Sequence, residues 1–255
     1  MSSFKNKVKD FLLKLYLLPV HSSTRLAMSV RNRVFPEYLH LRGLVLAIHN
    51  FRSKDEFGKT ILDIGCFEGN TSLFFLKELK DVNVIGFEAS SQSYRQAIAT
   101  TEKYNAVKIE NYALSDFCGT TEFYVTDNKV SSSLNPVTGT DTRFSTVKVE
   151  QVNTITLDEY FLNHAESEQK ILAMKLDVQG HELKVLKGAE KMLKNTLFIL
   201  TELSNHSSYQ GSAHYYEVDQ VLRQNGFVLQ NIFASYSHSR YLYEYDAIYI
   251  NSALL

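Results

Sequence analysis

The sequence predicts an α/β fold in which a mostly parallel sheet, with an antiparallel edge strand, carries helices on both faces. From Thr60 onward, apolar segments of strand length alternate with amphipathic segments of helix length, a pattern typical of parallel sheets covered on both sides. Before Thr60 the apolar spacing is helical, as at Leu41, Leu44, Val45 and Ile48. We therefore predict an N-terminal helical extension over residues 1–57 and one α/β domain over residues 58–255.

The expected elements follow one another along the chain. The strands expected to be parallel are Ile61–Ile64, Val84–Phe87, Val107–Ile109, Ile171–Leu176 and Phe198–Leu200. The helices expected to connect or follow them are Thr71–Leu79, Ser91–Lys103, Glu182–Leu193 and Glu217–Gln224. Two later strands, Phe227–Ile232 and Ala247–Ile250, have no helical pattern between them. We expect these two to pair as an antiparallel edge, which mixed sheets commonly carry.

The stretch between Asp116 and Leu157 departs from this alternation. We expect a hairpin strand over Thr121–Val125 and then a polar loop rich in serine over residues 131–139. The loop follows the third strand, which places it at the carboxyl edge of the sheet, where α/β proteins bind ligands. We expect it to fold over a bound ligand and exclude water; a solvated surface loop is the alternative.

The N-terminal segment combines charge with an apolar run. Lys5, Lys7 and Lys9 precede Phe11–Val20, but the run is too short to span a bilayer and no small-residue cleavage site follows it. We expect an amphipathic helix that docks on the main domain or on another subunit of a homo-oligomer. Peripheral membrane attachment through the Lys and Leu/Phe faces is the less favoured alternative.

Composition excludes several classes of partner. The formal net charge is -1, so no basic bias indicates a nucleic-acid partner. The two cysteines, Cys66 and Cys118, suggest reduced thiols and a cytoplasmic protein rather than a disulfide framework. The eight histidines form no Cys/His cluster at zinc-site spacing, so no metal site is expected.

The segment from Thr60 to Ser72 carries the strongest functional signal. An apolar strand leads into Gly65, a turn follows, and Gly69 precedes a helix that begins near Asn70. Glycine lets the backbone turn sharply and approach a ligand closely. The loop lacks the Gly-x-Gly-x-x-Gly pattern of dinucleotide sites, and Asp63 on the strand favours a cationic or amine-bearing ligand over a pyrophosphate, which it would repel.

A second acidic residue follows the next expected strand. Glu88 lies about 25 positions after Asp63, close to the offset at which a carboxylate binds ribose hydroxyls in nucleotide-binding α/β folds. A carboxylate can accept hydrogen bonds from both hydroxyls of a diol. Together, Asp63, the two glycines and Glu88 predict a site for an aminoacyl nucleoside.

Several motifs, taken in order, resemble the FkbM family of S-adenosylmethionine-dependent methyltransferases. The matching segments are Leu62–Gly65 with Gly69, Gly86–Ala89, Asn111–Asp116 followed by Gly119, Ile155–Asp158, Lys175–Glu182 and Val185–Ala189. The resemblance covers roughly residues 60–230 and implies the Rossmann-like sheet of class I methyltransferases, with S-adenosylmethionine as the cofactor.

The resemblance also implies roles for individual residues. Asp63, Gly65 and Gly69 would surround the methionine half of the cofactor, Glu88 the ribose, and Ala113–Ser115 the adenine edge. The full set expected at the cofactor is Asp63, Gly65, Cys66, Phe67, Gly69, Asn70, Thr71, Ser72, Glu88, Ala89, Ala113, Leu114, Ser115 and Asp177. Two positions depart from the family pattern: Phe67 stands where Asn is frequent, and Gln179 where Glu is frequent.

The acceptor side is expected at the ends of the fourth and fifth strands. Methyl transfer from a sulfonium is an in-line displacement, so the protein must position the acceptor and remove its proton. We expect Asp177 to position the acceptor or act as base, with His181 or His206 as the alternative base. Glu202 is a further candidate, and a divalent cation held by Asp177, Glu202 and Asn205 is a less favoured alternative.

The predicted function is methyl transfer to a hydroxyl of a sugar, glycan or polyketide-like small molecule; the hydroxyl itself is implied by the family resemblance. A non-catalytic module that keeps the cofactor pocket is one alternative. An NAD-dependent oxidoreductase is another, disfavoured by Asp63 and by the missing glycine. Tyrosines concentrated near the C-terminus can stack on a sugar ring or pack in the core: Tyr209, Tyr215, Tyr216, Tyr236, Tyr241, Tyr243 and Tyr245.

Overall fold

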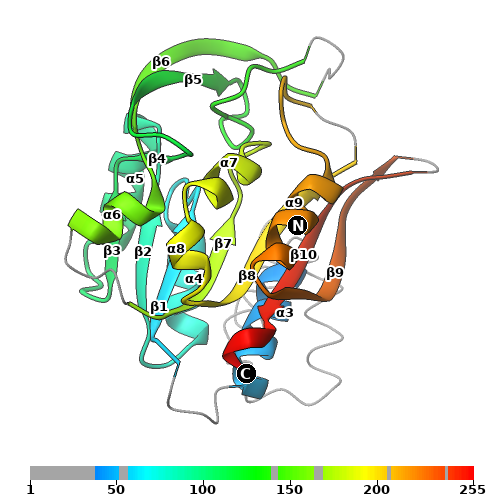
Figure 1. Cartoon of the computed structure of the whole chain (residues 1–255). Coiled ribbons are helices and arrows are strands. Elements are labelled where there is room, and N and C mark those ends of the chain that lie inside the picture. Colours follow the sequence, from blue (N-terminus) through cyan, green and yellow to red (C-terminus); the bar gives the residue numbers. More distant parts are fainter. Residues whose placement is uncertain (1–37, 52–56, 139–142, 164–168, 206–207, 239–240) are drawn as a thin grey trace, which may run out of the picture.

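A seven-stranded sheet in the order β3-β2-β1-β7-β8-β10-β9 organises the chain (Figure 1). The computed structural model describes residues 38–51, 57–138, 143–163, 169–205, 208–238 and 241–255. The strands of this sheet are β1 (Thr60–Ile64), β2 (Asn83–Phe87), β3 (Val107–Glu110), β7 (Ile171–Leu176), β8 (Thr196–Ser204), β9 (Phe227–His238) and β10 (Tyr241–Asn251).

Strand directions agree with the predicted class of sheet. The neighbouring strands β3, β2, β1, β7 and β8 pair in parallel, whereas β10 runs antiparallel to both β8 and β9. The mostly parallel sheet with an antiparallel pair at its edge is therefore confirmed. Within that pair, β10 is the inner strand and β9 is the outer one.

Helices cover both faces of the sheet, as the alternation predicted. They are α3 (Leu39–Phe51), α4 (Asn70–Glu78), α5 (Ser91–Thr101), α6 (Leu157–Asn163), α7 (Glu182–Lys187), α8 (Glu190–Leu193) and α9 (Tyr215–Gln224). Successive strand residues face opposite sides: on β8, Phe198 packs in the cluster that contains α3 and α4, and Ile199 in the cluster that contains α6 to α9. Figure 1 shows α7, α8 and α9 in front of the sheet and α3 behind it.

The helix predicted over Glu182–Leu193 is interrupted, and the reason is tertiary. Gly188 packs so closely on another segment that an added Cβ would lie 2.0 Å from the carbonyl oxygen of Ser115. Beyond this contact the chain restarts as α8, where the Asp158 carboxylate accepts hydrogen bonds from the backbone N–H groups of Lys191 and Met192. A carboxylate at unpaired N–H groups stabilises a helix start.

A smaller three-stranded sheet, β4-β6-β5, stands over the upper end of the large sheet (Figure 1). Its strands are β4 (Ala113–Leu114), β5 (Gly119–Thr126) and β6 (Thr146–Ile155). The expected strand Thr121–Val125 lies within β5, but the sequence did not predict β6. Most of β6 faces solvent, and its apolar residues Val147 and Val149 are exposed. Its sequence therefore lacks the clear alternation of buried apolar and exposed polar residues by which a strand is predicted.

The N-terminal extension is described only at its end. Helix α3 buries Leu41, Leu44, Val45 and Ile48 against the sheet, which confirms the predicted helical spacing there. The apolar run Phe11–Val20 and the rest of residues 1–37 lie outside the described residues, so the boundary at residue 57 stays a prediction. Among the described helices, none is both long and apolar enough to cross a membrane.

Candidate active site

A cavity of about 230 Å³ lies at the carboxyl ends of β1, β2 and β7. Six segments line it: the β1–α4 turn, the end of β2, the start of α5, the small sheet, residues 129–134 of the β5–β6 connection, and the β7–α7 turn. Parallel α/β sheets bind ligands at this edge because the loops that leave the strands gather there. The serine-rich loop therefore lies where the sequence predicted, over the cavity.

The β1–α4 turn depends on two glycines in left-handed backbone. Gly65 has φ 76° and Gly69 has φ 82°, a region that other residues rarely adopt. At Gly65, an added Cβ would lie 2.0 Å from the carbonyl oxygen of Asp177. The N–H groups of Gly65 and Cys66 donate to the carbonyl of Phe87 at 3.0 and 3.1 Å, so the turn is held between the ends of β2 and β7.

Glu88 forms part of the cavity wall just beyond β2. Its Oε2 accepts a hydrogen bond from the backbone N–H of Phe67 at 2.9 Å, and its Oε1 accepts from the N–H of Ser90 at 2.9 Å. Burial raises the pKa of Glu88 to about 7, against the opposing effect of these two N–H groups. The carboxylate is thus fixed in place and retains lone pairs for a diol.

The Asp63 carboxylate lies behind the cavity and does not line it. It is fully buried, Oδ2 accepts a hydrogen bond from the Ser72 hydroxyl at 2.7 Å, and Oδ1 lies 3.3 Å from Lys175 Nζ. Lys175 itself lines the cavity, donates to the carbonyl of Gly65 at 3.1 Å and lies 3.4 Å from Asp177 Oδ2. Contrary to what the sequence had led us to expect, Asp63 therefore does not contact the ligand directly. Its negative charge is instead paired with the buried ammonium group of Lys175.

Apolar side chains form another part of the cavity wall. Ala113 and Leu114 of β4 meet Phe123 and Val125 of β5, and Leu134 of the connection completes the wall. Aromatic and aliphatic walls of this kind favour a planar, weakly polar ring. The segment predicted at the adenine edge thus borders such a slot.

His181 acts as a link between three segments and is not available as a base. It is 4% exposed, with Nε2 3.0 Å from the Ser115 hydroxyl and Nδ1 3.1 Å from Asn135 Oδ1. Since Asn135 donates its amide N–H to the carbonyl of Gly180, its Oδ1 accepts from Nδ1–H of His181. Burial lowers the pKa of His181 to about 4. A neutral ring with both nitrogens engaged is a weak proton acceptor.

Asp177 and Glu202 lie on either side of the Gln179 amide nitrogen, which is 2.8 Å from Asp177 Oδ1 and 3.4 Å from Glu202 Oε2. The side chain of Asp177 is 45% exposed and lines the cavity, whereas Glu202 lines a smaller adjoining pocket. Burial would raise the pKa of Asp177, but the Lys175 ammonium group and the amide of Gln179 outweigh that effect and hold it below its usual range. Burial and neighbouring carboxylates, first among them Asp177, raise the pKa of Glu202 well above its usual value.

The N-terminal helix adds a histidine to this region. Asp246 on β10 pairs in register with Glu202 on β8, and His40 Nδ1 at the start of α3 lies 3.4 Å from Asp246 Oδ2. Burial lowers the pKa of His40 to about 4, with Asp177 and Lys175 acting on it in opposite directions. His40 could not be singled out from the sequence, because no short-range motif surrounds it.

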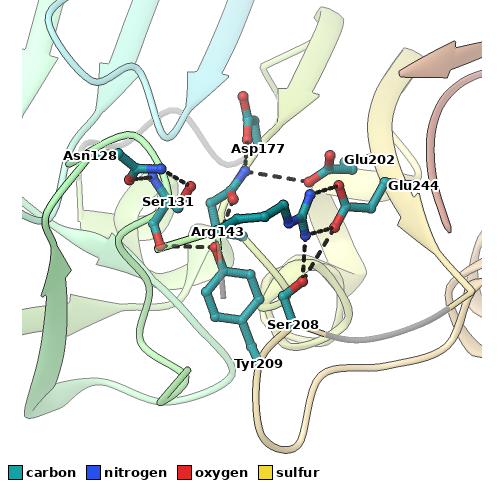
Figure 2. Close-up of polar contacts among 9 residues, drawn as sticks. Asn128, Ser131, Arg143, Asp177, Glu202, Ser208, Tyr209 and Glu244 are labelled. Atoms are coloured by element: carbon teal, nitrogen blue, oxygen red, sulfur yellow. Dashed lines mark hydrogen bonds and ion pairs between the residues drawn. The ribbon is translucent and has the colours of Figure 1, made fainter. Parts of the chain in front are cut away.

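The β5–β6 connection is fastened to the β8–α9 loop (Figure 2). The Tyr209 hydroxyl lies 2.8 Å from the carbonyl oxygen of Ser131 and 2.8 Å from the Gln179 amide oxygen, so its single proton is shared between these two acceptors. Arg143 forms a two-pronged ion pair with Glu244, with N···O distances of 2.9 and 3.2 Å, and donates to the Ser208 hydroxyl at 2.7 Å. These contacts tie the β5–β6 connection, which covers the cavity, to the β8–α9 loop and to β10.

Comparison with known proteins decides the family. A family model described as "Methyltransferase FkbM domain" matches residues 63–229. The chain belongs to the FkbM methyltransferase family. S-adenosylmethionine is therefore its cofactor, and both the family and the cofactor predicted from the sequence are confirmed.

Solved methyltransferase structures show a weaker similarity to this FkbM chain. Magnesium protoporphyrin IX methyltransferase (ChlM) from Synechocystis PCC 6803 with bound SAM is 12% identical over 97% of each chain, with a TM-score of 0.48. N-methyltransferase NodS from Bradyrhizobium japonicum WM9 is 9% identical over 83% of this chain and 96% of its own, with a TM-score of 0.45. Aeropyrum pernix fibrillarin is 11% identical over 80% of this chain and 74% of its own, with a TM-score of 0.43. No curated protein matches the chain.

The donor set of the cavity fits the cofactor of an FkbM protein. Glu88 offers a fixed carboxylate for a ribose diol, the Ala113–Leu114 wall an apolar slot for adenine, and Lys175 with Asp177 a charged end for the amino acid part. Among the described residues, no group of three or more His, Cys, Asp or Glu side chains is arranged to hold a metal ion.

The predicted site residues divide into two groups in this FkbM structure. Those that line the cavity are Gly65, Cys66, Phe67, Thr71, Glu88, Ala89, Ala113, Leu114, Asp177 and His181. Those that lie behind it or beside it are Asp63, Gly69, Asn70, Ser72, Ser115 and Glu202. His206 lies outside the described residues.

Sequence reasoning assigned no individual role to Lys175 or Gln179, and it offered Tyr209 only as one of several tyrosines that can stack on a sugar ring or pack in the core. Lys175 carried a signal, because a lysine inside the apolar strand Ile171–Leu176 requires a buried partner. Tyr209 stood out only as one of many C-terminal tyrosines. Its hydroxyl partners lie 30 and 78 positions away in the chain, beyond what local pattern reveals.

Proposed function

We propose that this FkbM methyltransferase transfers a methyl group to a hydroxyl of a sugar, glycan or polyketide-like small molecule. The observation that carries the proposal is the pair Asp177, which lines the cavity, and Glu202, which lines the adjoining pocket; the Gln179 amide bridges them, and their pKa values shift in opposite directions. Such a pair can divide two tasks: a carboxylate that stays ionised orients a hydroxyl, and one with a raised pKa accepts its proton.

The chain's own residues would hold the cofactor in three parts. Glu88 would accept hydrogen bonds from the ribose hydroxyls, and the wall of Ala113 and Leu114 would cover the adenine. The polar end formed by Gly65, Lys175 and Asp177 would receive the amino acid part. When bound, S-adenosylmethionine supplies an electrophilic methyl group on a sulfonium.

On the acceptor side, Asp177 would accept a hydrogen bond from the hydroxyl and orient its oxygen. Glu202 would take the proton as the oxygen forms its bond to the methyl carbon and the carbon–sulfur bond breaks toward sulfur. Glu202 suits this step because a carboxylate with a raised pKa is a stronger proton acceptor than an ordinary carboxylate. Asp177, with a lowered pKa, remains ionised and is the better positioning group.

Aromatic residues near the second pocket support a sugar as acceptor. Tyr215 and Tyr216 begin α9 and are 42% and 56% exposed, and the Tyr216 ring stacks on His214 at 5.5 Å. Ser212 and Ala213, just before them, line the pocket that contains Glu202. Exposed rings beside carboxylates can stack on the apolar face of a sugar while the carboxylates bind its hydroxyl groups.

A labelled-methyl assay tests the proposal. The full chain is incubated with S-adenosylmethionine and panels of sugars, glycans, polyketide alcohols and amines, and products are identified by mass spectrometry. We expect an O-methyl product from the wild-type chain. In Glu202→Gln, loss of the general base should lower kcat for this product by about 10²- to 10⁴-fold. Methylation confined to amines would overturn the hydroxyl assignment, and cofactor binding with no transfer to any panel would favour a non-catalytic module.

A further inference from the structure

Gln179 sits at the junction of the cofactor cavity and the adjoining pocket, in a left-handed backbone with φ 55°. Its amide nitrogen donates to Asp177 Oδ1 at 2.8 Å and lies 3.4 Å from Glu202 Oε2. Its amide oxygen accepts a hydrogen bond from the Tyr209 hydroxyl at 2.8 Å. Figure 2 labels the three partners Asp177, Glu202 and Tyr209.

The chemistry of the carboxamide is what the position requires. An amide nitrogen has two N–H groups and can serve two carboxylates at once, while its oxygen still accepts from a phenol. A glutamate at position 179 has the same shape, but it offers no donor and adds a further negative charge. A left-handed backbone is also unfavourable for an L-residue, so the rest of the turn must hold the side chain in this place.

We propose that Gln179 is a positioning residue that holds Asp177 and Glu202 together as one acceptor-binding pair and, through Tyr209, couples that pair to the segment that covers the cavity. The proposal rests on the proposed function, since it assumes that the acceptor binds at these two carboxylates. Gln179 itself need not touch the acceptor.

The charges around the pair explain why a donor between them matters. Glu202 is surrounded by acidic groups from three neighbouring elements: Asp177, Glu182, Glu244 and Asp246. Two carboxylates that share a site cannot both ionise freely, and one pKa then rises strongly. A bridging amide stabilises the ionised forms without adding charge.

Nearby cations also stabilise the ionised form of Asp177, and the Gln179 amide adds to their effect. Lys175 on β7 stabilises its ionised form, and His40 on α3 acts in the same direction when protonated. The Gln179 amide is the second-strongest contribution after Lys175 to keeping the pKa of Asp177 low, against burial. Replacing the amide by a carboxylate therefore removes a donor and adds repulsion at the same point.

The link to the covering segment runs through a single phenol. The Tyr209 hydroxyl lies 2.8 Å from both the Gln179 amide oxygen and the carbonyl oxygen of Ser131. The Ser133 hydroxyl adds a bond of 2.7 Å to the backbone carbonyl of Gln179. Residues 129–134, which line the cavity, thus share partners with the acceptor-side pair.

Three variants of the full chain separate the two parts of the proposal. Gln179→Glu removes the amide donor to the carboxylates but keeps an oxygen for the Tyr209 hydroxyl. Tyr209→Phe keeps the Gln179 amide and removes the hydroxyl, while it preserves the ring that stacks on Phe144 at 5.7 Å. Gln179→Gly removes both and suits the left-handed backbone. Carboxyl groups are titrated by carbon-13 NMR, and backbone exchange of residues 129–134 is followed by hydrogen–deuterium exchange.

We expect Gln179→Glu to raise the apparent pKa of Asp177 by about 1 or more and to leave exchange of the segment unchanged. Tyr209→Phe should accelerate that exchange at least threefold and leave the titration unchanged, and Gln179→Gly should alter both. An unchanged Asp177 titration in Gln179→Glu, or unchanged exchange in Tyr209→Phe, would overturn the proposal. Neither readout requires an acceptor, so failure of the proposed function would appear separately, in the transfer assay.

Discussion

Lys175 Nζ lies 3.3 Å from Asp63 Oδ1, and both side chains are buried where β1 and β7 run side by side. The two residues are register partners on adjacent parallel strands. The ion pair neutralises Asp63, the carboxylate that the sequence predicted would bind the ligand. It also places the Lys175 ammonium group in the cavity wall. The charged end of the site therefore consists of Lys175 and Asp177.

Lys175→Met should destabilise the protein strongly, because it leaves the Asp63 carboxylate buried without its counter-ion. Breaking a buried pair from one side costs about 3–5 kcal/mol in unfolding free energy, measurable by urea denaturation. The double variant Asp63→Asn, Lys175→Met should recover a substantial part of that loss. Additive losses in the double-mutant cycle would mean that the two side chains do not interact energetically.

Gly65→Ala should impair cofactor binding, because the new Cβ would lie 2.0 Å from the backbone oxygen of Asp177 and displace either the turn or β7. Gly211→Ala is the matched control: Gly211 also has a positive φ, 71°, but nothing lies within 4 Å of its added Cβ. Both variants pay about 1–2 kcal/mol for the left-handed backbone. Calorimetry with S-adenosylhomocysteine should show lost affinity for Gly65→Ala alone; equal losses would contradict a role for close packing.

Cofactor affinity should depend on pH through Glu88. Its pKa is raised to about 7 by burial, and only the ionised form accepts hydrogen bonds from both ribose hydroxyls. Affinity should therefore fall as pH decreases through 7, by roughly tenfold between pH 8 and pH 6 for a single group of this pKa. Glu88→Gln should bind more weakly at pH 8 and lose most of this pH dependence. A wild-type profile that is flat over this range would remove Glu88 from the ribose site.

Buried neutral histidines should make the fold sensitive to mild acid. The pKa of His181 is lowered by burial to about 4, from an ordinary value of 6.5, so the unfolded chain binds the proton more tightly. Unfolding free energy should then fall as pH decreases from about 6.5 toward 4, by up to about 3 kcal/mol for this group. His181→Gln should remove that part of the slope, while His40, shifted in the same direction, keeps its own. An identical slope in His181→Gln would show that the ring is not buried neutral.

Much of the cofactor half of the site could be predicted because its signals are local. The β1–α4 turn occupies a few consecutive residues, and its glycines, the strand before them and the helix after them are readable in order. Glu88 follows directly from the end of β2. Of the acceptor half, Asp177 and Glu202 could be predicted only as candidates and His40 not at all, because these residues follow β7, lie on β8 and lie on α3, and come together only when these elements pack.

Two expectations changed for the same physical reason. Asp63 seemed free to bind an amine until the parallel pairing of β1 with β7 placed Lys175 beside it. His181 suited a base by type, but the packing of Ser115 and Asn135 against both ring nitrogens turned it into a structural link. Burial and partners, which periodicity does not encode, set the charge state of both groups.

The amino-acid sequence alone determined the strands of the large sheet, most of its helices, the glycine turn and the family, since hydrophobic period, backbone freedom and motif spacing act over short stretches of chain. The tertiary structure decided which carboxylates are free, which are paired and which change their pKa. Those properties depend on distances of a few ångströms between residues far apart in the chain, and only packing sets such distances.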